Sequence, residues 1–161
     1  MFFYDAECAL CNGFVKLLLR NNDTIKFSAL DSDVSKFVIG QNLPSKVSAP
    51  TDTSVLYKNG RLYFEYECVL ESLDLCPLLG TETKLLRLLN KLIGNKLSNK
   101  LYRLVSNNRY YLSNKMLRLL YRLPLLFRLL VYKIPLIGLF MEVCTNDICE
   151  LENPKYKDRF I

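Results

Sequence analysis

The chain opens with the stretch Phe2-Phe3-Tyr4-Asp5-Ala6-Glu7-Cys8-Ala9-Leu10-Cys11, and the order of residue types within it indicates the local fold. The aromatic run at residues 2–4 is typical of a buried strand. Apolar residues recur at helical spacing from Ala9 to Arg20. The stretch therefore predicts a strand, a short polar turn and a helix, with Cys8 and Cys11 where the helix begins.

A second strand and a second helix are expected next. Residues 24–28 alternate between apolar and polar at period two, which predicts a strand. Asp31 or Ser32 is placed to cap a helix that ends before Gly40. The apolar residues of this helix are Val34, Phe37 and Val38. The two strands and the helix between them predict a parallel crossover.

The following segment predicts a hairpin and a third helix. Residues 54–64 contain two apolar runs separated by Lys58-Asn59-Gly60, and Asn-Gly is typical of a tight hairpin turn. Residues 67–79 predict a helix that is interrupted by Pro77.

This order of elements predicts an α/β protein with a thioredoxin-like βαβαββα core, because a parallel crossover is followed by a hairpin and a closing helix. The core accounts for residues 1–80. Residues 81–161 predict a basic, leucine-rich α-helical C-terminal extension packed on it. A chain of 161 residues with 50% hydrophobic residues is long enough for one sizeable core.

The spacing of Cys8 and Cys11 is suited to thiol-disulfide exchange. At a helix N-terminus, unpaired backbone N–H groups and the helix dipole favour the thiolate, which is the reactive form of cysteine. The spacing also brings both sulfurs into one helical turn, so the second can attack a mixed disulfide formed by the first. We expect Cys8 to be the nucleophile and Cys11 to be the resolving thiol, kept protonated by burial. No cofactor is expected.

The same residues resemble a known family. Tyr4-Asp5-Ala6-Glu7-Cys8-Ala9-Leu10-Cys11-Asn12 resembles the signature of the DCC family of thiol-disulfide oxidoreductases, in which an aromatic residue and Asp-Gly precede the cysteine pair. Residues 53–70 are similar to the hairpin and following helix of that family, and residues 101–110 to its downstream Arg-Tyr motif. The resemblance covers about residues 1–115. It implies a thioredoxin-like fold and a thiol-disulfide oxidoreductase activity whose substrate is generally undefined. We expect the partner of the exchange to be a protein or small-molecule disulfide or thiol.

Two positions depart from the family pattern. Ala6 stands where the family usually has glycine, so a positive φ there would strain the loop before Cys8. Asp52 or Thr53 stands where many thioredoxin-like proteins have a cis-proline beside the active cysteines, and Pro50 is displaced from that place. These departures predict a modified substrate groove.

Four residues near the cysteine pair are candidates for proton transfer or for shaping the site. They are Tyr4, Asp5, Glu7 and Thr53. A carboxylate close to a thiol can accept or donate its proton. The simpler interpretation makes Asp5 a turn-forming residue and Glu7 a solvated one. Both carboxylates would also oppose thiolate formation at Cys8.

The other cysteines leave several roles open. Cys68 and Cys76 lie about two helical turns apart, too far for a direct disulfide, and are expected in the core. Cys144 and Cys149 are a possible second redox pair, a disulfide or two inert thiols. The alternative to a redox centre is a zinc site with the four ligands Cys8, Cys11, Cys144 and Cys149. The protein would then be a thioredoxin-like adaptor without redox turnover.

Charge is distributed unevenly along the chain. Residues 1–79 hold seven basic and ten acidic residues, whereas residues 80–161 hold fifteen and six. Residues 83–133 contain twelve basic residues and no acidic one. We expect most leucines of this stretch to pack on the thioredoxin-like domain. The cations favour an anionic membrane surface as partner, as in an interfacial helix.

Nucleic acid is the weaker alternative for the basic stretch, because no reading motif accompanies the tyrosines that could stack on bases. They are Tyr102, Tyr110 and Tyr111. No secretory leader is seen, and charged residues and prolines interrupt the apolar run at residues 117–141. We therefore expect a cytoplasmic protein that binds the membrane peripherally.

Overall fold

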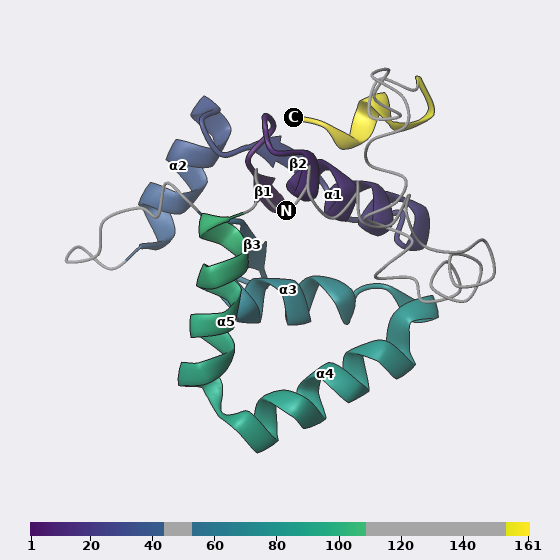
Figure 1. Ribbon diagram of the computed structural model, residues 1–161. Helices are drawn as coiled ribbons and strands as arrows, with labels where there is room; N and C mark the ends of the chain where they lie inside the picture. Colours follow the sequence, from purple (N-terminus) through teal and green to yellow (C-terminus); the bar gives the residue numbers. More distant parts are fainter. Residues whose placement is uncertain (44–52, 109–153) are drawn as a thin grey trace.

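A computed structural model describes residues 1–43, 53–108 and 154–161 of the chain (Figure 1). The strands are β1 (Phe2–Tyr4), β2 (Phe27–Ala29), β3 (Val55–Lys58) and β4 (Arg61–Phe64). The α-helices are α1 (Ala9–Asn21), α2 (Asp33–Asn42), α3 (Glu65–Leu73), α4 (Gly80–Ile93) and α5 (Asn95–Asn107). Short 3-10 helices are η1 (Pro77–Leu79) and η3 (Pro154–Arg159).

The four strands form one sheet with the order β2-β1-β3-β4. Strand β1 pairs in parallel with β2, where Phe2 is opposite Phe27, and antiparallel with β3, where Phe2 is opposite Leu56. Strands β3 and β4 form the predicted hairpin, and Asn59 and Gly60 at its turn both have a positive φ, 52° and 76°. A parallel crossover followed by a hairpin and α3 confirms the predicted thioredoxin-like α/β fold.

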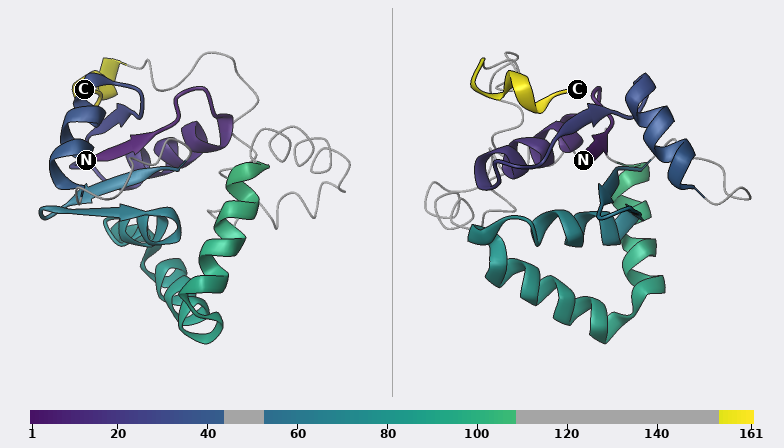
Figure 2. Two further views of the ribbon diagram at one scale, coloured as in Figure 1. Left: turned by 90° about the vertical axis from the view of Figure 1, so that its left-hand side faces the viewer. Right: turned by 180° about the vertical axis from the view of Figure 1, so that it is seen from behind.

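Helices cover both faces of the sheet (Figure 2). Because neighbouring residues of a strand point to opposite faces, Phe2 and Phe3 enter different apolar cores. Phe2 packs with Leu18 of α1 and Leu73 of α3, while Phe3 packs with Ile39 of α2. Helices α1 and α3 therefore cover one face, and α2 covers the other.

The second strand begins later than the alternation of residues 24–28 predicts. The side-chain oxygen of Asn22 accepts hydrogen bonds from the backbone N–H groups of Thr24 at 2.7 Å and Ile25 at 2.8 Å. These bonds hold both residues in a turn. The strand consequently starts at Phe27, and the predicted start at residue 24 is wrong.

Helix α2 begins as predicted but is longer than expected. Ser32 is its N-cap, and the hydroxyl accepts the backbone N–H of Ser35 at 3.1 Å. The helix continues past Gly40 to Asn42. Its buried side is formed by Ser35 and Ile39, which are four residues apart. Phe37 lies on another side of the helix and is 68% exposed.

Helix α3 ends well before the predicted end at residue 79. The backbone N–H groups of Leu75 and Cys76 bond to the carbonyls of Ser72 and Leu73, three residues earlier. This tighter bonding ends the α-helical pattern, and Pro77 has no N–H with which to resume it. Residues 77–79 form only the single 3-10 turn η1.

Residues 154–161 lie against the edge strand β2. The backbone N–H of Ile161 donates to the carbonyl of Phe27 at 3.0 Å, and the Ser28 hydroxyl donates to the carbonyl of Ile161 at 2.6 Å. The rings of Phe27 and Phe160 lie 5.6 Å apart. This segment therefore covers the edge of the sheet. The division of the chain at residue 80 into a domain and an extension stays a prediction.

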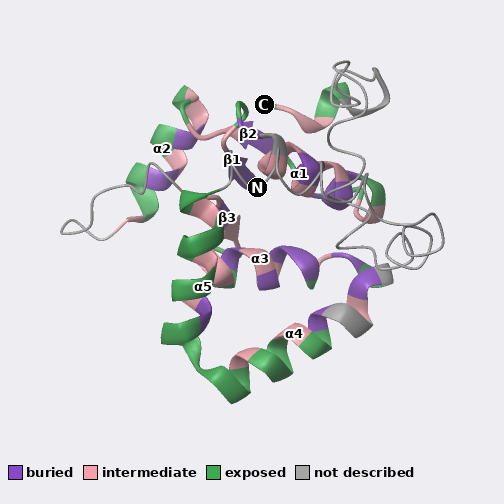
Figure 3. Ribbon diagram, viewed as in Figure 1, coloured by how far each residue is buried: buried purple, intermediate pink, exposed green. Residues whose placement is uncertain are grey.

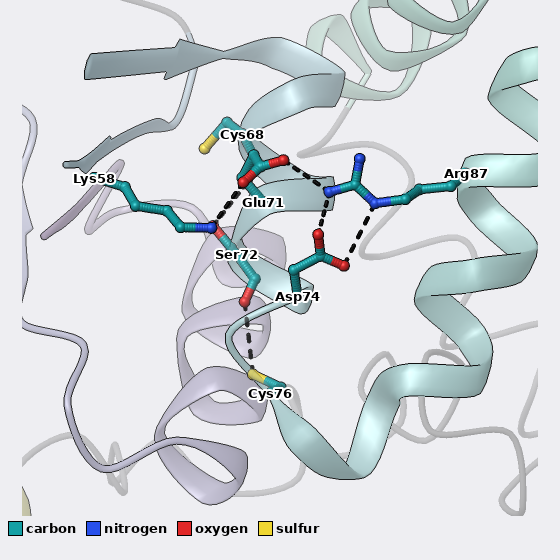
Figure 4. Close-up of polar contacts among 7 residues, drawn as sticks. All are labelled: Lys58, Cys68, Glu71, Ser72, Asp74, Cys76 and Arg87. Atoms are coloured by element: carbon teal, nitrogen blue, oxygen red, sulfur yellow. Dashed lines mark hydrogen bonds and ion pairs between the residues drawn. The ribbon is translucent and has the colours of Figure 1, made fainter. Parts of the chain in front are cut away.

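Helix α4 contacts the domain through polar residues and through Leu86, which packs against the core, rather than through the rest of its leucines. Arg87 of α4 binds Glu71 of α3 and Asp74 just after it, and Glu71 also accepts a hydrogen bond from Lys58 of β3 at 2.7 Å (Figure 4). The expectation that the leucines of this helix pack on the domain is wrong for four of them. Leu85, Leu88, Leu89 and Leu92 are 43% to 73% exposed. No helix among residues 1–43, 53–108 and 154–161 meets the length and hydropathy needed to cross a membrane.

The charge state of Glu71 follows from this network. Partial burial opposes ionisation of the carboxyl, but the hydrogen bonds from Lys58 and Arg87 outweigh that effect and lower its pKa. The Asp74 and Glu71 carboxylates in turn raise the pKa of Arg87. Glu71 and Arg87 are therefore charged at neutral pH, and the network joins β3, α3 and α4.

The substitution Glu71→Gln is expected to lower the free energy of unfolding by about 1–2 kcal/mol at neutral pH, because it removes a carboxylate that binds two cations. Folding lowers the pKa of Glu71, so this stabilisation is complete above the pKa in the unfolded chain and is lost as the pH falls through the folded-state pKa. Urea unfolding at neutral and acidic pH measures the difference. Glu67→Gln, at an exposed position of the same helix, is the matched control. A difference that does not change with pH would contradict the assignment.

Candidate functional site

Cys8 lies at the N-terminus of α1, which confirms the predicted strand, turn and helix. It is the N-cap residue, with an extended backbone at φ −88° and ψ 112°. Its sulfur accepts a hydrogen bond from the backbone N–H of Cys11 at 3.3 Å. A sulfur in this position receives both a donated N–H and the positive end of the helix dipole, and both stabilise a thiolate.

Asp5 shapes the turn before Cys8. Its carboxylate accepts the backbone N–H of Glu7 at 3.0 Å, and its carbonyl accepts the N–H of Cys8 at 3.3 Å. The Asn12 side chain donates to the carbonyl of Ala6 at 2.9 Å. Ala6 is not among the residues with a positive φ in the described part of the chain, so the strain expected from the missing glycine does not arise. Side-chain hydrogen bonds build this turn instead.

The two cysteines of the pair differ in exposure, and the order is the reverse of the expected one. Cys8 is 1% exposed, whereas Cys11 is partly exposed and packs at the margin of the core. An N-cap side chain folds back over the first turn of its helix to reach an N–H group, which encloses the Cys8 sulfur. The expectation that Cys11 is the more buried thiol is therefore wrong. No disulfide joins the two sulfurs in the structure.

Tyr102 of α5 also reaches this region. Its hydroxyl lies 2.9 Å from the hydroxyl of Thr53, just before β3. Burial raises the pKa of the Tyr102 phenol, and negative charge on Cys68 or Cys11 raises it further. Val55 of β3 is opposite Phe3 of β1, so Thr53 lies beside the end of β1, where the turn toward Cys8 begins. Helix α5 and the loop before β3 therefore meet close to that turn. The sequence interpretation considered Tyr102 only for base stacking and as part of the Arg-Tyr motif, and it missed this contact.

The next residue of the motif fixes α5 at a second point. The Arg103 guanidinium donates to the Glu65 carboxylate at 2.6 Å. Glu65 has a φ of 51°, in the left-handed region that a residue with a Cβ rarely adopts. Such a backbone persists only where surrounding contacts hold it. Tyr102 and Arg103 thus bind the domain, while the adjacent Leu101 is 51% exposed.

The remaining candidates near the pair differ in their surroundings. Tyr4 is buried in the core that contains Phe2, and its carbonyl accepts the backbone N–H of Leu30 at 2.9 Å. Glu7 is exposed on the turn. The roles of Tyr4, Asp5, Glu7 and Thr53 in proton transfer or site shaping stay predictions.

Cys68 and Cys76 are core residues, as predicted, and are 0% and 1% exposed. Figure 4 shows both on the segment around Ser72. Burial raises the pKa of the Cys68 thiol far above its usual range, and burial raises the pKa of Cys76 to about 11. Both thiols are therefore protonated at neutral pH and are poor nucleophiles.

The zinc site requires residues that the structure does not describe. Within the described ranges, no three His, Cys, Asp or Glu side chains gather as a metal site would require. Cys144 and Cys149 lie outside those ranges. The four-cysteine zinc site therefore stays a prediction, and so do a second redox pair, a disulfide and two inert thiols at Cys144 and Cys149.

Comparison with known protein families agrees with this geometry. A family model described as DCC1-like thiol-disulfide oxidoreductase matches residues 2–115, more than half of the chain. The chain belongs to the DCC1-like thiol-disulfide oxidoreductase family. The resemblance carried by the opening motif is thereby confirmed. The matched range includes the cysteine pair, Thr53 and the Arg-Tyr motif. Neither the curated proteins nor the solved structures contain a match to this chain.

In this DCC1-like protein, the contact between Thr53 and Tyr102 can be measured by a double-mutant cycle. Thr53→Val and Tyr102→Phe each remove one hydroxyl and keep the shape of the side chain. The cycle is expected to give a coupling free energy of about 0.5–1.5 kcal/mol in urea unfolding, as for a neutral hydrogen bond. Tyr66→Phe, paired with Thr53→Val, is the control, because the Tyr66 hydroxyl donates to the carbonyl of Leu86 instead. Additive effects of Thr53→Val and Tyr102→Phe would show that the two hydroxyls do not interact.

Proposed function

We propose that the protein exchanges electrons with a protein or small-molecule disulfide through Cys8 and Cys11. The observation that carries the proposal is the N-cap position of Cys8, whose sulfur accepts the N–H of Cys11, in a chain of a thiol-disulfide oxidoreductase family. A dithiol at a helix N-terminus supports this chemistry without any further group.

The reaction proceeds in two exchanges. The Cys8 thiolate attacks one sulfur of the substrate disulfide, the substrate S–S bond breaks, and one substrate thiolate leaves and takes up a proton. A mixed disulfide then joins Cys8 to the remaining substrate sulfur. Cys11 loses its proton and attacks the Cys8 sulfur, which releases the second substrate thiol. The substrate gains two electrons and two protons, and the Cys8–Cys11 dithiol becomes a disulfide.

Two physical arguments compete over which sulfur attacks first. Exposure favours Cys11, because a substrate reaches a partly exposed sulfur more easily than one that is 1% exposed. The helix N-terminus favours Cys8, because only the thiolate is nucleophilic and the N-cap stabilises it. We assign the first attack to Cys8, which requires the first turn of α1 to admit the substrate sulfur.

The turn residues support the reaction by holding Cys8 in place. Asp5 already accepts the backbone N–H of Glu7, so its main contribution is the shape of the turn. We also propose that the protein works in the cytoplasm, where reducing conditions suit a dithiol enzyme whose core contains two further thiols, Cys68 and Cys76.

Single substitutions in the pair separate the two attack orders. Cys8→Ser is expected to lower the rate of disulfide reduction by at least about a hundredfold, because it removes the thiolate nucleophile. Cys11→Ser is expected to accumulate a mixed disulfide with a small aromatic disulfide, because the resolving thiol is missing. Mass spectrometry of the intact protein detects the adduct. Cys76→Ala, which removes a buried thiol outside the pair, is the matched control.

The opposite trapping pattern, with an adduct on Cys8→Ser and none on Cys11→Ser, would reverse the assignment of nucleophile and resolving thiol. Full activity in both variants would exclude the pair as the redox centre. Zinc bound in a one-to-one ratio by the purified full chain, together with no titratable dithiol, would favour the adaptor with a zinc site.

A further inference from the structure

Helices α4 and α5 are exposed over much of their length (Figure 3), and many of their exposed residues are large and apolar. The exposed fractions range from 39% to 73%. The residues are Leu85, Leu88, Leu89, Leu92, Ile93, Leu97, Leu101, Leu104 and Val105. Elsewhere in the described part of the chain, the large hydrophobic residues exposed to this degree are Phe37 and Ile161. Contiguous exposed apolar surface on a folded protein indicates an interaction site.

In α4, the side that faces the domain is polar except for Leu86, which packs against the core. Thr83 is 2% exposed, and Arg87 binds the carboxylates of Glu71 in α3 and of Asp74 just after it. Successive residues of a helix are rotated by about 100°, so Leu85 and Leu92 lie on the side opposite Thr83. They are 58% and 73% exposed. The exposed leucines of α4, which do not include Leu86, therefore point away from the domain.

Helix α5 also turns a polar side toward the domain. Ser98 is 1% exposed, and Tyr102 bonds to Thr53. At about 100° per residue, Leu97 and Leu104 lie well away from this buried side, and they are 46% and 61% exposed. Apart from Leu86, both helices thus attach to the domain through polar residues and present their exposed leucines to the outside.

Positive charge accompanies the exposed leucines. Lysine side chains stand exposed on both helices, and none of them forms an ion pair with another described residue. They are Lys84, Lys91, Lys96 and Lys100. Residues 83–141 contain no acidic residue. The outer side of α4 and α5 therefore combines apolar and cationic side chains, as do helices that lie in a membrane interface.

We propose that the outer side of α4 and α5, formed by their eight exposed leucine and isoleucine residues and these four lysines, docks on an anionic lipid bilayer. The leucines enter the boundary between headgroups and acyl chains, and the lysines remain at the level of the anionic headgroups. Both helices lie on the bilayer, and neither crosses it.

Charge decides between a bilayer and the other possible occupants. The segment at residues 109–141 of the same chain adds six basic residues and no acidic one, so it offers no countercharge to the lysines. A second copy would present the same cationic surface. The phosphates of a nucleic acid would pair with the lysines, but the leucines would remain exposed to water. An anionic bilayer offers negatively charged headgroups to the lysines and an apolar interior to the leucines.

Docking in this way would hold the cysteine pair close to the bilayer. The inner side of α5 carries Tyr102, which bonds to Thr53 beside the end of β1, where the turn toward Cys8 begins, while the outer side contacts lipid. Membrane-associated disulfides would then be the substrates within reach, a consequence that also rests on the proposed redox function. The docking itself does not depend on that function.

Co-sedimentation of the full chain with vesicles tests the proposal. Binding to vesicles of phosphatidylcholine with about one-third phosphatidylserine is expected to be at least about tenfold tighter than binding to pure phosphatidylcholine, and to weaken at high salt. The double substitution Leu92→Gln and Leu104→Gln is expected to weaken binding at least about tenfold, because it removes two inserted side chains. Lys96→Gln with Lys100→Gln is expected to reduce the preference for anionic vesicles.

Matched controls use the opposite part of the molecule. Phe37→Gln replaces an equally exposed apolar residue on α2, and Lys36→Gln an exposed lysine beside it, and neither should change binding. Equal binding to neutral and anionic vesicles would overturn the proposal. A large drop in the thermal stability of the Leu92→Gln, Leu104→Gln protein without vesicles would also overturn it. Such a drop would mean that another part of the same chain covers these leucines. Dimerisation in sedimentation equilibrium that this variant abolishes would assign the surface to a second copy instead.

Discussion

The central position of β1 is the constraint on which the rest of the domain depends. This strand of three residues pairs with β2 on one side and β3 on the other. Its two phenylalanines fill the cores on both faces of the sheet. Because α1 starts only a short turn after β1 ends, the strand also determines where Cys8 lies. The backbone pairing that stabilises the sheet therefore positions the candidate nucleophile as well.

Local sequence patterns predicted most of the core because each had one dominant physical cause. The Asn59-Gly60 turn forms because both residues tolerate a positive φ, and Ser32 caps α2 because its hydroxyl accepts an orphan N–H. The errors arose where longer-range or competing bonds decide. The Asn22 side chain holds Thr24 and Ile25 in a turn, although the alternation of residues 24–28 predicts a strand there. Backbone hydrogen bonds to the carbonyls of Ser72 and Leu73 end α3 early.

The candidate site was predictable in position but not in its surroundings. The spacing of Cys8 and Cys11 and the strand before them were sufficient to place the pair at a helix N-terminus. Their relative exposure was not predictable, because it depends on how the N-cap side chain folds over the first turn. Tyr102 and Thr53, which contact each other, are 49 residues apart in the chain, and a local sequence pattern does not predict a contact over that separation.

Amphipathic periodicity has a related limit in α4 and α5. A periodic pattern shows that a helix has a polar side and an apolar side, but it does not show which side meets the domain. Burial of the leucines is the usual outcome, because it removes apolar surface from water. Here Arg87 meets a pair of carboxylates on α3, and Tyr102 and Arg103 bind Thr53 and Glu65. These specific polar contacts orient both helices with their leucines outward. The polar residues of the domain that receive them thus determine the chemistry of the outer surface.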